Sequence, residues 1–343
     1  MSLQICLVPK LDGLGGMVSF QAKFIQGLEQ RDIRHTFDLS HHDNTAILVI
    51  GGTRQLLRLW LAKKRGVKIV QRLNGMNWLH KVRKTTIKAA LRAEINNLIL
   101  AFIRKYLADS IIYQSDFSQA WWEKVYKKIE HPIHVVYNGV DLDAYTPDGM
   151  ESPPKDHYRI LLVEGHLGLS DMQSLENAIK LAQALTSDHQ LKVELIIVGA
   201  VSDQVKANAH IMAPSLKVTW RGVVNRSEIP SINRAAHVLF SADINAACPN
   251  SVIEALACGL PVLAFDTGAL AEIVKQGAGE VVPYGADHWQ LEAPAIPPLA
   301  EACIKILENN PKYRNQARIW AEETFGLETM VDAYMEVLGG SND

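Results

Sequence analysis

Short apolar runs alternate with longer amphipathic segments along most of the chain. Residues 4–9, 46–50, 68–73 and 110–115 have the apolar character of buried strands, and residues 16–32 carry apolar side chains near helical spacing. Strands that alternate with helices are typical of βαβ units and a parallel, doubly wound sheet. The pattern therefore predicts an α/β domain in the first part of the chain.

The alternation stops and then restarts. Residues 137–158 are rich in Pro, Gly and acidic residues, which indicates a linker. After the linker we expect strands at 159–165, 192–200, 217–222, 238–242 and 261–265, and helices at 173–186, 227–236, 251–258 and 313–338. The sequence thus predicts two α/β domains, 1–150 and 151–321.

Composition and cysteine spacing agree with an intracellular protein of two domains. A chain of 343 residues is too long for one typical core. Apolar runs such as 191–200 are too short to cross a bilayer, and the first residues lack the pattern of a signal peptide. The four cysteines are widely spaced, with no Cys-x-x-Cys pair, so we expect free thiols in the cytoplasm.

Charge is distributed unevenly between the two halves. Residues 1–150 hold 21 Lys and Arg against 13 Asp and Glu, whereas the remainder holds 14 against 24. Between Asp43 and Glu94 there are 12 basic residues and no acidic one. Such a field attracts phosphates, acidic glycans or a lipid surface, although a solvated basic face has the same composition. We do not expect nucleic acid as a partner, because no RNA- or DNA-binding motif is present.

The stretch "NAACPNSVIEALACGLPVLAFDTG", residues 245–268, combines an apolar helical pattern with a carboxylate at Glu254. A charge in a buried helix needs a partner, which is either a nearby Lys or Arg or a ligand. Asn250, Ser251 and Val252 open the predicted helix, so their backbone amides are available to hold a diphosphate. Asn250 or Ser251 is equally suited to cap the helix.

A glycine-rich turn follows the first predicted strand. Gly15 and Gly16 in "DGLGGMVSF" stand between that strand and the first predicted helix. Glycines allow positive φ and a close approach of the backbone to a phosphate or sugar, but they also serve a plain turn. The segment does not match the G-x-G-x-x-G dinucleotide fingerprint, which disfavours a nicotinamide-dependent oxidoreductase.

Four segments together resemble a glycosyltransferase of the retaining, family-4 group with the GT-B fold. They are "DGLGGMVSF" at 12–20, "ADSIIYQSDFS" at 108–118, "VVYNGVDLDAYTP" at 135–147 and "SVIEALACGLPVLAFDTGALAEIV" at 251–274. The resemblance covers nearly the whole chain. It implies two Rossmann-like domains with a cleft between them, the first for the acceptor and the second for the donor. It also implies that a helix at about 322–343 packs back on the first domain.

The resemblance assigns donor-binding roles in the second domain. Glu254 is expected to accept hydrogen bonds from the ribose hydroxyls of the nucleotide, and the amides of residues 250–252 to bind its diphosphate. The backbone at Gly222 and Val223 is expected to contact the base. Gly15 and Gly16 are expected to face the donor from the first domain.

The remaining candidates concern catalysis and the acceptor. Asn74 stands about where many relatives have a His that contacts the donor sugar, and His166 stands about where they have an Arg. We assign both to the catalytic set. Arg72 and Asn77 are the acceptor-binding candidates, with a surface ion pair as the alternative for Arg72.

Two further departures from the family pattern motivate a second interpretation. Ala246 occupies the position of the first of two acidic residues, with Asn245 beside it, and Asp171 falls about where a Lys is expected. A carboxylate near a diphosphate opposes its binding. The alternative function is therefore a catalytically impaired nucleotide-sugar-binding or partner subunit of a glycan assembly system.

The resemblance also suggests the reaction partners. A UDP- or GDP-sugar is the expected co-substrate and a glycan, lipid-linked saccharide or small molecule the acceptor, with retention and without a cofactor or metal. Asp141 and Asp143 spell D-x-D but lie in the linker. Residues 77–107 mix Trp78, leucines and basic residues, which suits either contact with an anionic membrane at the inner face or an ordinary domain helix.

Overall fold

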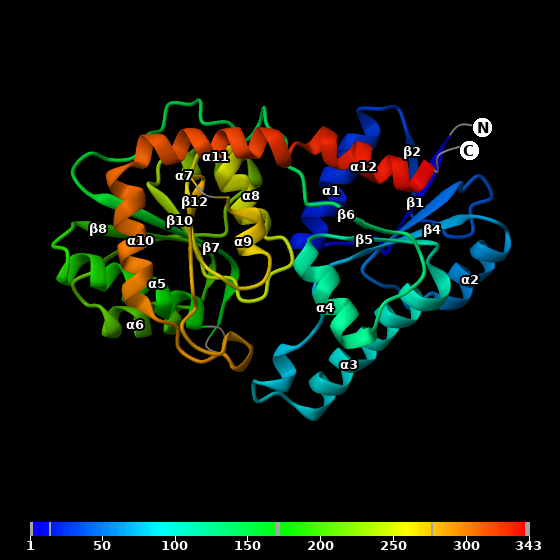
Figure 1. Cartoon of the computed structure of the whole chain (residues 1–343), viewed down its shortest axis with the longest axis horizontal. Helices are drawn as coiled ribbons and strands as arrows, with labels where there is room; N and C mark the ends of the chain where they lie inside the picture. The colour runs from blue at the N-terminus through cyan, green and yellow to red at the C-terminus, as the bar shows by residue number, and fades with distance from the viewer. Residues whose placement is uncertain (1–2, 14, 169–171, 276, 340–343) are drawn as a thin grey trace. The chain divides into compact units, whose positions relative to one another are not determined.

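The computed structural model describes residues 3–13, 15–168, 172–275 and 277–339. The chain divides into two compact units (Figure 1). Unit 1 comprises Met1–Gly139 and Leu327–Asp343, and unit 2 comprises Val140–Gly326, so the division lies close to the predicted boundaries. Val140 and Gly326 form an isolated parallel bridge, which means that the chain enters and leaves unit 2 at neighbouring residues.

Unit 1 is built on a six-stranded parallel sheet with the order β2-β1-β3-β4-β5-β6. Its strands are β1 (Gln4–Val8), β2 (Arg34–Thr36), β3 (Ala46–Ile50), β4 (Lys68–Leu73), β5 (Ser110–Tyr113) and β6 (Ile133–Val135). Its helices are α1 (Gly16–Glu29), α2 (Leu56–Lys64), η1 (Leu79–Lys81), α3 (Ile87–Phe102), η2 (Ile103–Leu107), α4 (Asp116–Tyr126) and α12 (Leu327–Gly339).

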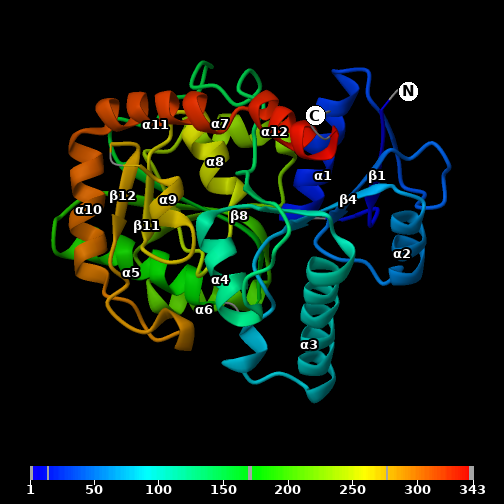
Figure 2. The same ribbon diagram turned by 45° about the vertical axis from the view of Figure 1, so that its right-hand side comes forward.

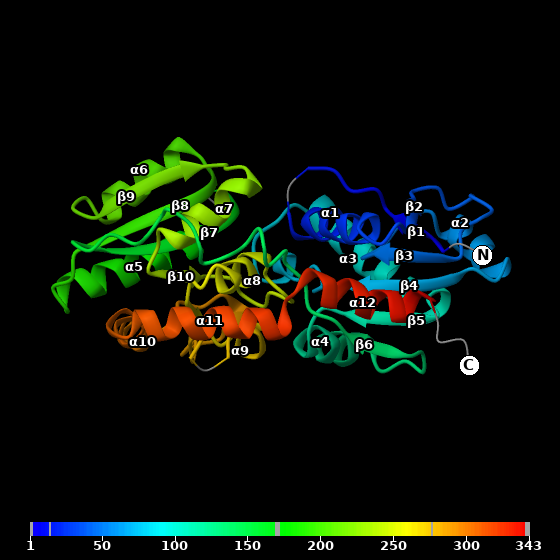
Figure 3. The same ribbon diagram turned by 90° about the horizontal axis from the view of Figure 1, so that it is seen from above.

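Helix α12 returns to unit 1 and packs beside α1, as Figures 1 and 3 both show. The ring of Tyr334 lies 5.3 Å from those of Phe20 and Phe24, and a Cβ atom at Gly27 would collide with Val331. Strands β1 and β3 are buried along their whole length, as expected for a parallel sheet covered on both faces.

Unit 2 contains a second six-stranded parallel sheet, with the order β12-β11-β10-β7-β8-β9. Its strands are β7 (Tyr158–Leu167), β8 (Val193–Val201), β9 (Lys217–Gly222), β10 (Val238–Ser241), β11 (Val262–Phe265) and β12 (Gly279–Val282). Its helices are α5 (Gln173–Ser187), α6 (Asp203–Met212), η4 (Arg226–Glu228), α7 (Ile229–Arg234), α8 (Asn250–Ala257), α9 (Leu270–Ile273), η5 (His288–Gln290), α10 (Ile296–Glu308) and α11 (Asn310–Thr324).

The main core of unit 2 lies between this sheet and helices α5 and α10. Seven residues of α5 and six of α10 are buried there. Because every strand pair in the sheet is parallel, the loops after β7, β9 and β10 leave from the same edge. Ligands of open α/β sheets bind at that carboxyl edge.

Several sequence expectations agree closely with the structure. Strands 46–50 and 68–73 have the predicted bounds, and the helix expected at 251–258 begins one residue earlier. The helical segment 313–338 is divided, because α11 ends at Thr324 and α12 begins at Leu327. The four cysteines are free, as expected, and the structure buries all of them. Within the described residues no helix is both long and apolar enough to span a bilayer.

Candidate functional site

The loop after β10 leads directly into α8, and this helix carries four of the eight predicted donor residues. Helix α8 buries Val252 and Ile253 on one side, whereas Glu254 is half-buried one turn after the helix start. The N-cap is Pro249, which has no side-chain hydrogen bond to the helix. The alternative in which Asn250 or Ser251 caps the helix is therefore wrong, since both residues lie inside its first turn.

The charge of Glu254 acts on two buried neighbours in unit 2. Burial, and next the charge of Glu254, raises the pKa of the Tyr145 phenol. Burial also raises the pKa of the Cys258 thiol to about 11, with a smaller contribution from Glu254. The carboxylate thus lies on the boundary between α8 and a low-dielectric interior, where its interactions are stronger than in water.

The structure adds a residue that sequence reasoning did not place in the site, Asn245. It lies in the loop before α8 with φ 58°, is 4% exposed, and neither its Oδ1 nor its Nδ2 has a hydrogen-bond partner among the described residues. A buried amide without partners is unfavourable by about 1–3 kcal/mol, so such a group calls for a functional explanation. The sequence offered one sign of this role: Asn245 stands beside Ala246, the position where the family pattern has its first acidic residue.

The same loop is held by the loop that follows β11. Thr267 Oγ1 donates a hydrogen bond to the Asp243 carbonyl at 3.0 Å, and the Ala269 amide donates to the Ala246 carbonyl at 2.9 Å. Gly268 has φ 60°, and a Cβ atom there would lie 2.5 Å from the Ala246 carbonyl oxygen. Only glycine therefore permits this close approach.

A carboxyl group with a perturbed pKa lies in the same loop. Burial raises the pKa of Asp243, and a 3.3 Å hydrogen bond with Ser241 Oγ partly offsets this shift. Carboxyl groups with raised pKa values are concentrated at functional sites. The sequence offered no sign of this shift, because it depends on the packing of the loop.

The predicted catalytic residue His166 and the other predicted donor residues of unit 2 lie at the same sheet edge but not all together. His166 is exposed near the end of β7, the strand next to β10. Gly222 ends β9 with φ 68°, and Val223 is 59% exposed beside it. His166 thus lies on the strand next to β10, which leads into the α8 loop, whereas β8 separates Gly222 and Val223 of the β9 end from β7. Asp171 lies outside the described residues.

In unit 1 the glycine turn has the backbone expected for it. Gly15 has φ 122° and ψ 171° and precedes α1, which begins at Gly16 without a side-chain cap. Gly13 has φ 95°, and a Cβ atom at either Gly13 or Gly15 would meet nothing within 4 Å. The turn therefore needs glycine for its conformation, and the space beside it is open.

A cavity of about 410 Å³ lies at the carboxyl edge of the unit 1 sheet. It is lined by residues that follow β1, β3 and β4, and by Arg92, Asn96, Ile99 and Leu100 of α3. Both Asn74 and Asn77 line it, so the structure brings a predicted catalytic residue and a predicted acceptor residue into one cavity. Its lining combines amide side chains, backbone groups, two arginines and several apolar side chains, and its polar members are suited to hydroxyl groups.

Two hydrogen-bond anchors fix these asparagines. Trp122 Nε1 donates to the Asn74 carbonyl at 2.7 Å. Asn97 of α3 accepts at Oδ1 from the Asn77 amide and from its Nδ2, at 3.0 and 3.1 Å, and donates from its own Nδ2 to the Asn77 carbonyl at 2.8 Å. The segment that carries both residues is therefore held by α4 and α3.

The structure buries Arg72, for which the sequence suggested either an acceptor contact or a surface ion pair. Its side chain is 1% exposed, donates from Nη2 to Asn138 Oδ1 at 2.8 Å, and lies 3.7 Å from the ring centroid of Phe20. It does not form a surface ion pair, and it does not line the cavity. The guanidinium is thus part of the interior of unit 1, and the assignment of Arg72 to the acceptor stays a prediction.

The D-x-D sequence of the linker has a local structural role. Asp141 Oδ1 accepts hydrogen bonds from the amides of Asp143 and Ala144, both at 3.1 Å. This is the Asx-turn arrangement, in which the carboxylate shapes its own loop.

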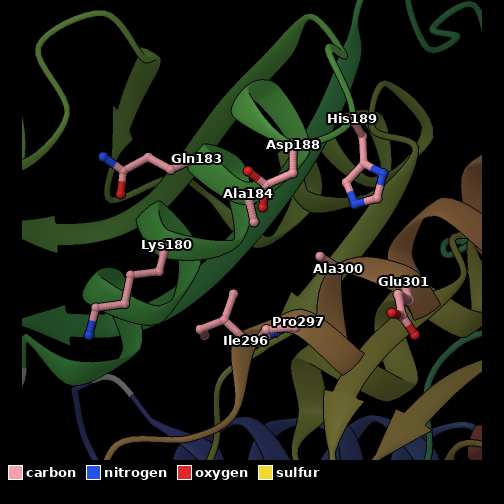
Figure 4. Close-up of a pocket in the computed structure, with 9 residues that line it drawn as sticks. All are labelled: Lys180, Gln183, Ala184, Asp188, His189, Ile296, Pro297, Ala300 and Glu301. Atoms are coloured by element: carbon pink, nitrogen blue, oxygen red, sulfur yellow. The ribbon is translucent and has the colours of Figure 1, made fainter.

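A second cavity, of about 460 Å³, lies in unit 2 between α5 and α10 (Figure 4). Lys180, Asp188 and Glu301 contribute charges of both signs, and Figure 4 shows Ile296 and Pro297 below Ala184. None of the sequence-predicted site residues lines it. The lining does not select one class of ligand, so we assign it no role.

The fold is shared with known glycosyltransferases. The structure of Anabaena HepE in complex with UDP and glucose is 16% identical and matches with a TM-score of 0.69 over 98% of this chain and 99% of that one. WaaG, a glycosyltransferase involved in lipopolysaccharide biosynthesis, is 14% identical, with a TM-score of 0.71 over 99% and 100%. At this identity the likeness establishes the fold, which is GT-B.

Sequence comparison establishes the family. The model of glycosyl transferases group 1 matches residues 151–323, half of the chain, and the protein belongs to that family. D-inositol 3-phosphate glycosyltransferase of Xylanimonas cellulosilytica is 30% identical over 171 residues, 45% of this chain and 40% of that protein. The Mycolicibacterium smegmatis protein of the same name is 23% identical over 241 residues, 66% and 52%. The chain thus spans about half the length of these curated relatives.

Proposed function

We propose that this protein transfers a sugar from a UDP- or GDP-sugar to an acceptor hydroxyl, with retention of the anomeric configuration. The observation that carries the proposal is the start of α8: Pro249 leaves the helix without a side-chain cap, and Glu254 stands half-buried one turn later. The match to the glycosyl transferases group 1 model includes this whole segment. The shared fold of HepE, whose structure contains UDP and glucose, supports UDP as one donor class.

The chemistry follows from the helix terminus. The first backbone amides of α8 and the positive end of the helix dipole hold the diphosphate and stabilise the charge that grows on the departing phosphate. Glu254 accepts hydrogen bonds from the ribose hydroxyls. His166, on the neighbouring strand, adds a donor to the phosphate side. No metal ion or cofactor enters the proposal.

Asn245 gives the donor sugar a further contact. Its amide offers one acceptor and two donor hydrogens, which suits sugar hydroxyls. Both polar atoms lie beneath the surface, so the loop before α8 must shift for them to reach a sugar. A ligand that supplies their missing hydrogen bonds offsets the desolvation that the buried amide now bears.

The acceptor is assigned to the cavity of unit 1. Asn74 and Asn77 offer amide groups to its hydroxyls, and neither side chain titrates near neutral pH. The departing phosphate, rather than a protein base, then takes the proton from the attacking hydroxyl. Gly15, where a Cβ atom would meet nothing within 4 Å, leaves open space beside the backbone of unit 1 for a sugar.

Thermal-shift measurements with UDP, GDP, ADP and their sugars test the donor site. One nucleotide should raise the melting temperature by mass action. Glu254→Ala should abolish that shift, whereas Glu308→Ala, an exposed carboxylate at the end of α10, should retain it. Equal shifts in the two variants would remove Glu254 from the site, and no response to any nucleotide would contradict the function.

A non-catalytic nucleotide-sugar-binding subunit is the second candidate. Ala246 favours it, because the position offers no carboxylate to the donor. Calorimetry that shows tight nucleotide-sugar binding, together with no sugar transfer across a panel of glycan and lipid-linked acceptors, would select this candidate over the enzyme.

A further inference from the structure

Helix α3 leaves an apolar stripe in solvent. All sixteen of its residues are described, and only Asn97 among them is buried. Ile87, Leu91, Ile95, Leu98 and Phe102 are 88%, 60%, 42%, 60% and 43% exposed. Their spacings of three and four residues place them within an arc of about 80° on one side of the helix. Figure 2 shows α3 extending away from the sheet of unit 1.

Basic residues lie along one edge of this stripe, and Glu94 lies at the other edge, about 20° beyond Ile87. Lys88 and Arg92 lie next to it on the helix, at about 100° and 140° from Ile87. They belong to the segment between Asp43 and Glu94, which has 12 Lys and Arg and no acidic residue. Glu94, the acidic residue of α3, is 2.8 Å from His80 Nε2 and 3.2 Å from Lys81 Nζ, so its charge is largely balanced.

The apolar and basic character continues beyond α3. Tyr106 of η2 is 56% exposed, and Lys105 Nζ lies 5.1 Å from its ring centroid. Helix α2 packs against η2 and exposes Leu57, Trp60 and Leu61 at 69%, 44% and 47%. Aromatic rings with lysines beside them suit the boundary between water and lipid, where one end is apolar and the other wet.

We propose that the α3 stripe, Ile87, Leu91, Ile95, Leu98 and Phe102, docks in the surface of an anionic lipid bilayer. An apolar face bordered by Lys and Arg is the arrangement by which a helix lies in a membrane interface, with basic residues reaching anionic headgroups. A second copy of the chain fits less well. A twofold contact through the stripe would bring two copies of the same basic surface together, and like charges repel.

The docking does not depend on the proposed function. If both hold, they point to a lipid-linked molecule as the acceptor. Arg92, Asn96, Ile99 and Leu100, on the adjacent side of α3, line the unit 1 cavity. A docked helix therefore places that cavity at the bilayer surface. If the cavity binds the acceptor, a lipid-linked acceptor reaches it without leaving the membrane.

Vesicle co-sedimentation of the full chain tests the docking. The wild type should bind vesicles of phosphatidylcholine mixed with phosphatidylglycerol, bind phosphatidylcholine alone weakly, and lose binding as salt is raised. The double variant Leu91→Ser and Leu98→Ser should bind the mixed vesicles roughly tenfold or more weakly. Ile211→Ser, which changes a 77% exposed apolar residue of α6, should bind like the wild type.

Two results would overturn the docking. One is equal vesicle binding by the Leu91/Leu98 double variant and by Ile211→Ser. The other is a wild type that binds neither the mixed vesicles nor those of phosphatidylcholine alone. Sedimentation velocity tests the second-copy alternative, since a dimer that only the double variant breaks would also contradict the proposal. Nucleotide thermal shifts in the double variant should stay unchanged, so a failure of docking is distinguishable from a failure of the proposed function.

Discussion

Helices α5 and α3 have nearly the same length, but α5 buries its apolar side chains and α3 exposes them. Helix α5 has 15 residues and buries seven of them against the unit 2 sheet and α10. Helix α3 has 16 and buries only Asn97. Both have the amphipathic spacing that a sequence pattern detects. The difference teaches that periodicity identifies an apolar face without telling whether a protein core or another medium covers it.

The largest expected contrast is a matched leucine truncation. Leu181 of α5 is fully buried and Leu98 of α3 is 60% exposed. Leu181→Ala should lower the free energy of unfolding by about 2–5 kcal/mol, because it leaves a cavity in the core of unit 2. Leu98→Ala should change it by no more than about 0.5 kcal/mol. Urea unfolding of both variants measures the difference, and similar losses would mean that α3 is covered within the protein.

A second contrast concerns two carboxylates and is sensitive to pH. Glu194 has a side chain 4% exposed in unit 2, and Glu94 of α3 is 40% exposed. Burial opposes ionisation of Glu194, but hydrogen bonds from Thr219, Arg159 and His157 prevail and lower its pKa to about 2. For Glu94, chiefly its hydrogen bond with His80 lowers the pKa. Water screens that exposed group, so its contribution to stability is small.

The lowered pKa of Glu194 determines how its contribution to the free energy of unfolding changes with pH. Ionised Glu194 stabilises the fold at any pH above the unfolded value of about 4.3, and this contribution of about 3 kcal/mol disappears as the pH falls through about 2. Glu194→Gln should therefore be destabilised at neutral pH, and its difference from the wild type should shrink below about pH 4. Glu94→Gln is the control, with little change at either pH. Chemical denaturation at both pH values measures this, and a pH-independent difference would contradict the role of the charge.

The smallest expected effect concerns the one buried residue of α3. Asn97→Ala removes three hydrogen bonds to Asn77, so unfolding should become easier by about 1–3 kcal/mol. It should also weaken acceptor use, because the segment that carries Asn74 and Asn77 loses its attachment. Asn96→Ala, a neighbour that lines the cavity, is the matched comparison for stability. If both variants unfold alike, the Asn97 contacts do not hold this segment.

Strand and helix positions could be predicted where the pattern is long and regular. The buried strands 46–50 and 68–73 and the amphipathic helix 173–186 are examples, since the strands are short apolar runs and the helix has apolar residues at helical spacing. Strands β2 and β6 have only three residues each and gave no such signal. Helix α10 was also missed, although its bounds enclose six buried residues.

The candidate site was less accessible to prediction, because it depends on contacts between distant segments. Buried Arg72 donates a hydrogen bond to Asn138, 66 positions away, and a single sequence cannot show that pairing. The isolation of the Asn245 amide arises from its left-handed backbone and the packing of its loop. The position of Glu254, in contrast, followed from helical spacing and the start of α8.

The return of α12 to unit 1 has a consequence for biosynthesis. Its buried residues, which include Val331 and Tyr334, close the core over Phe20 and Phe24 but follow all of unit 2 along the chain. On the ribosome, unit 2 therefore emerges complete while α1 still exposes its aromatic side chains, a state prone to aggregation. A frameshift after residue 326 would spare the later unit and leave the earlier one unfinished.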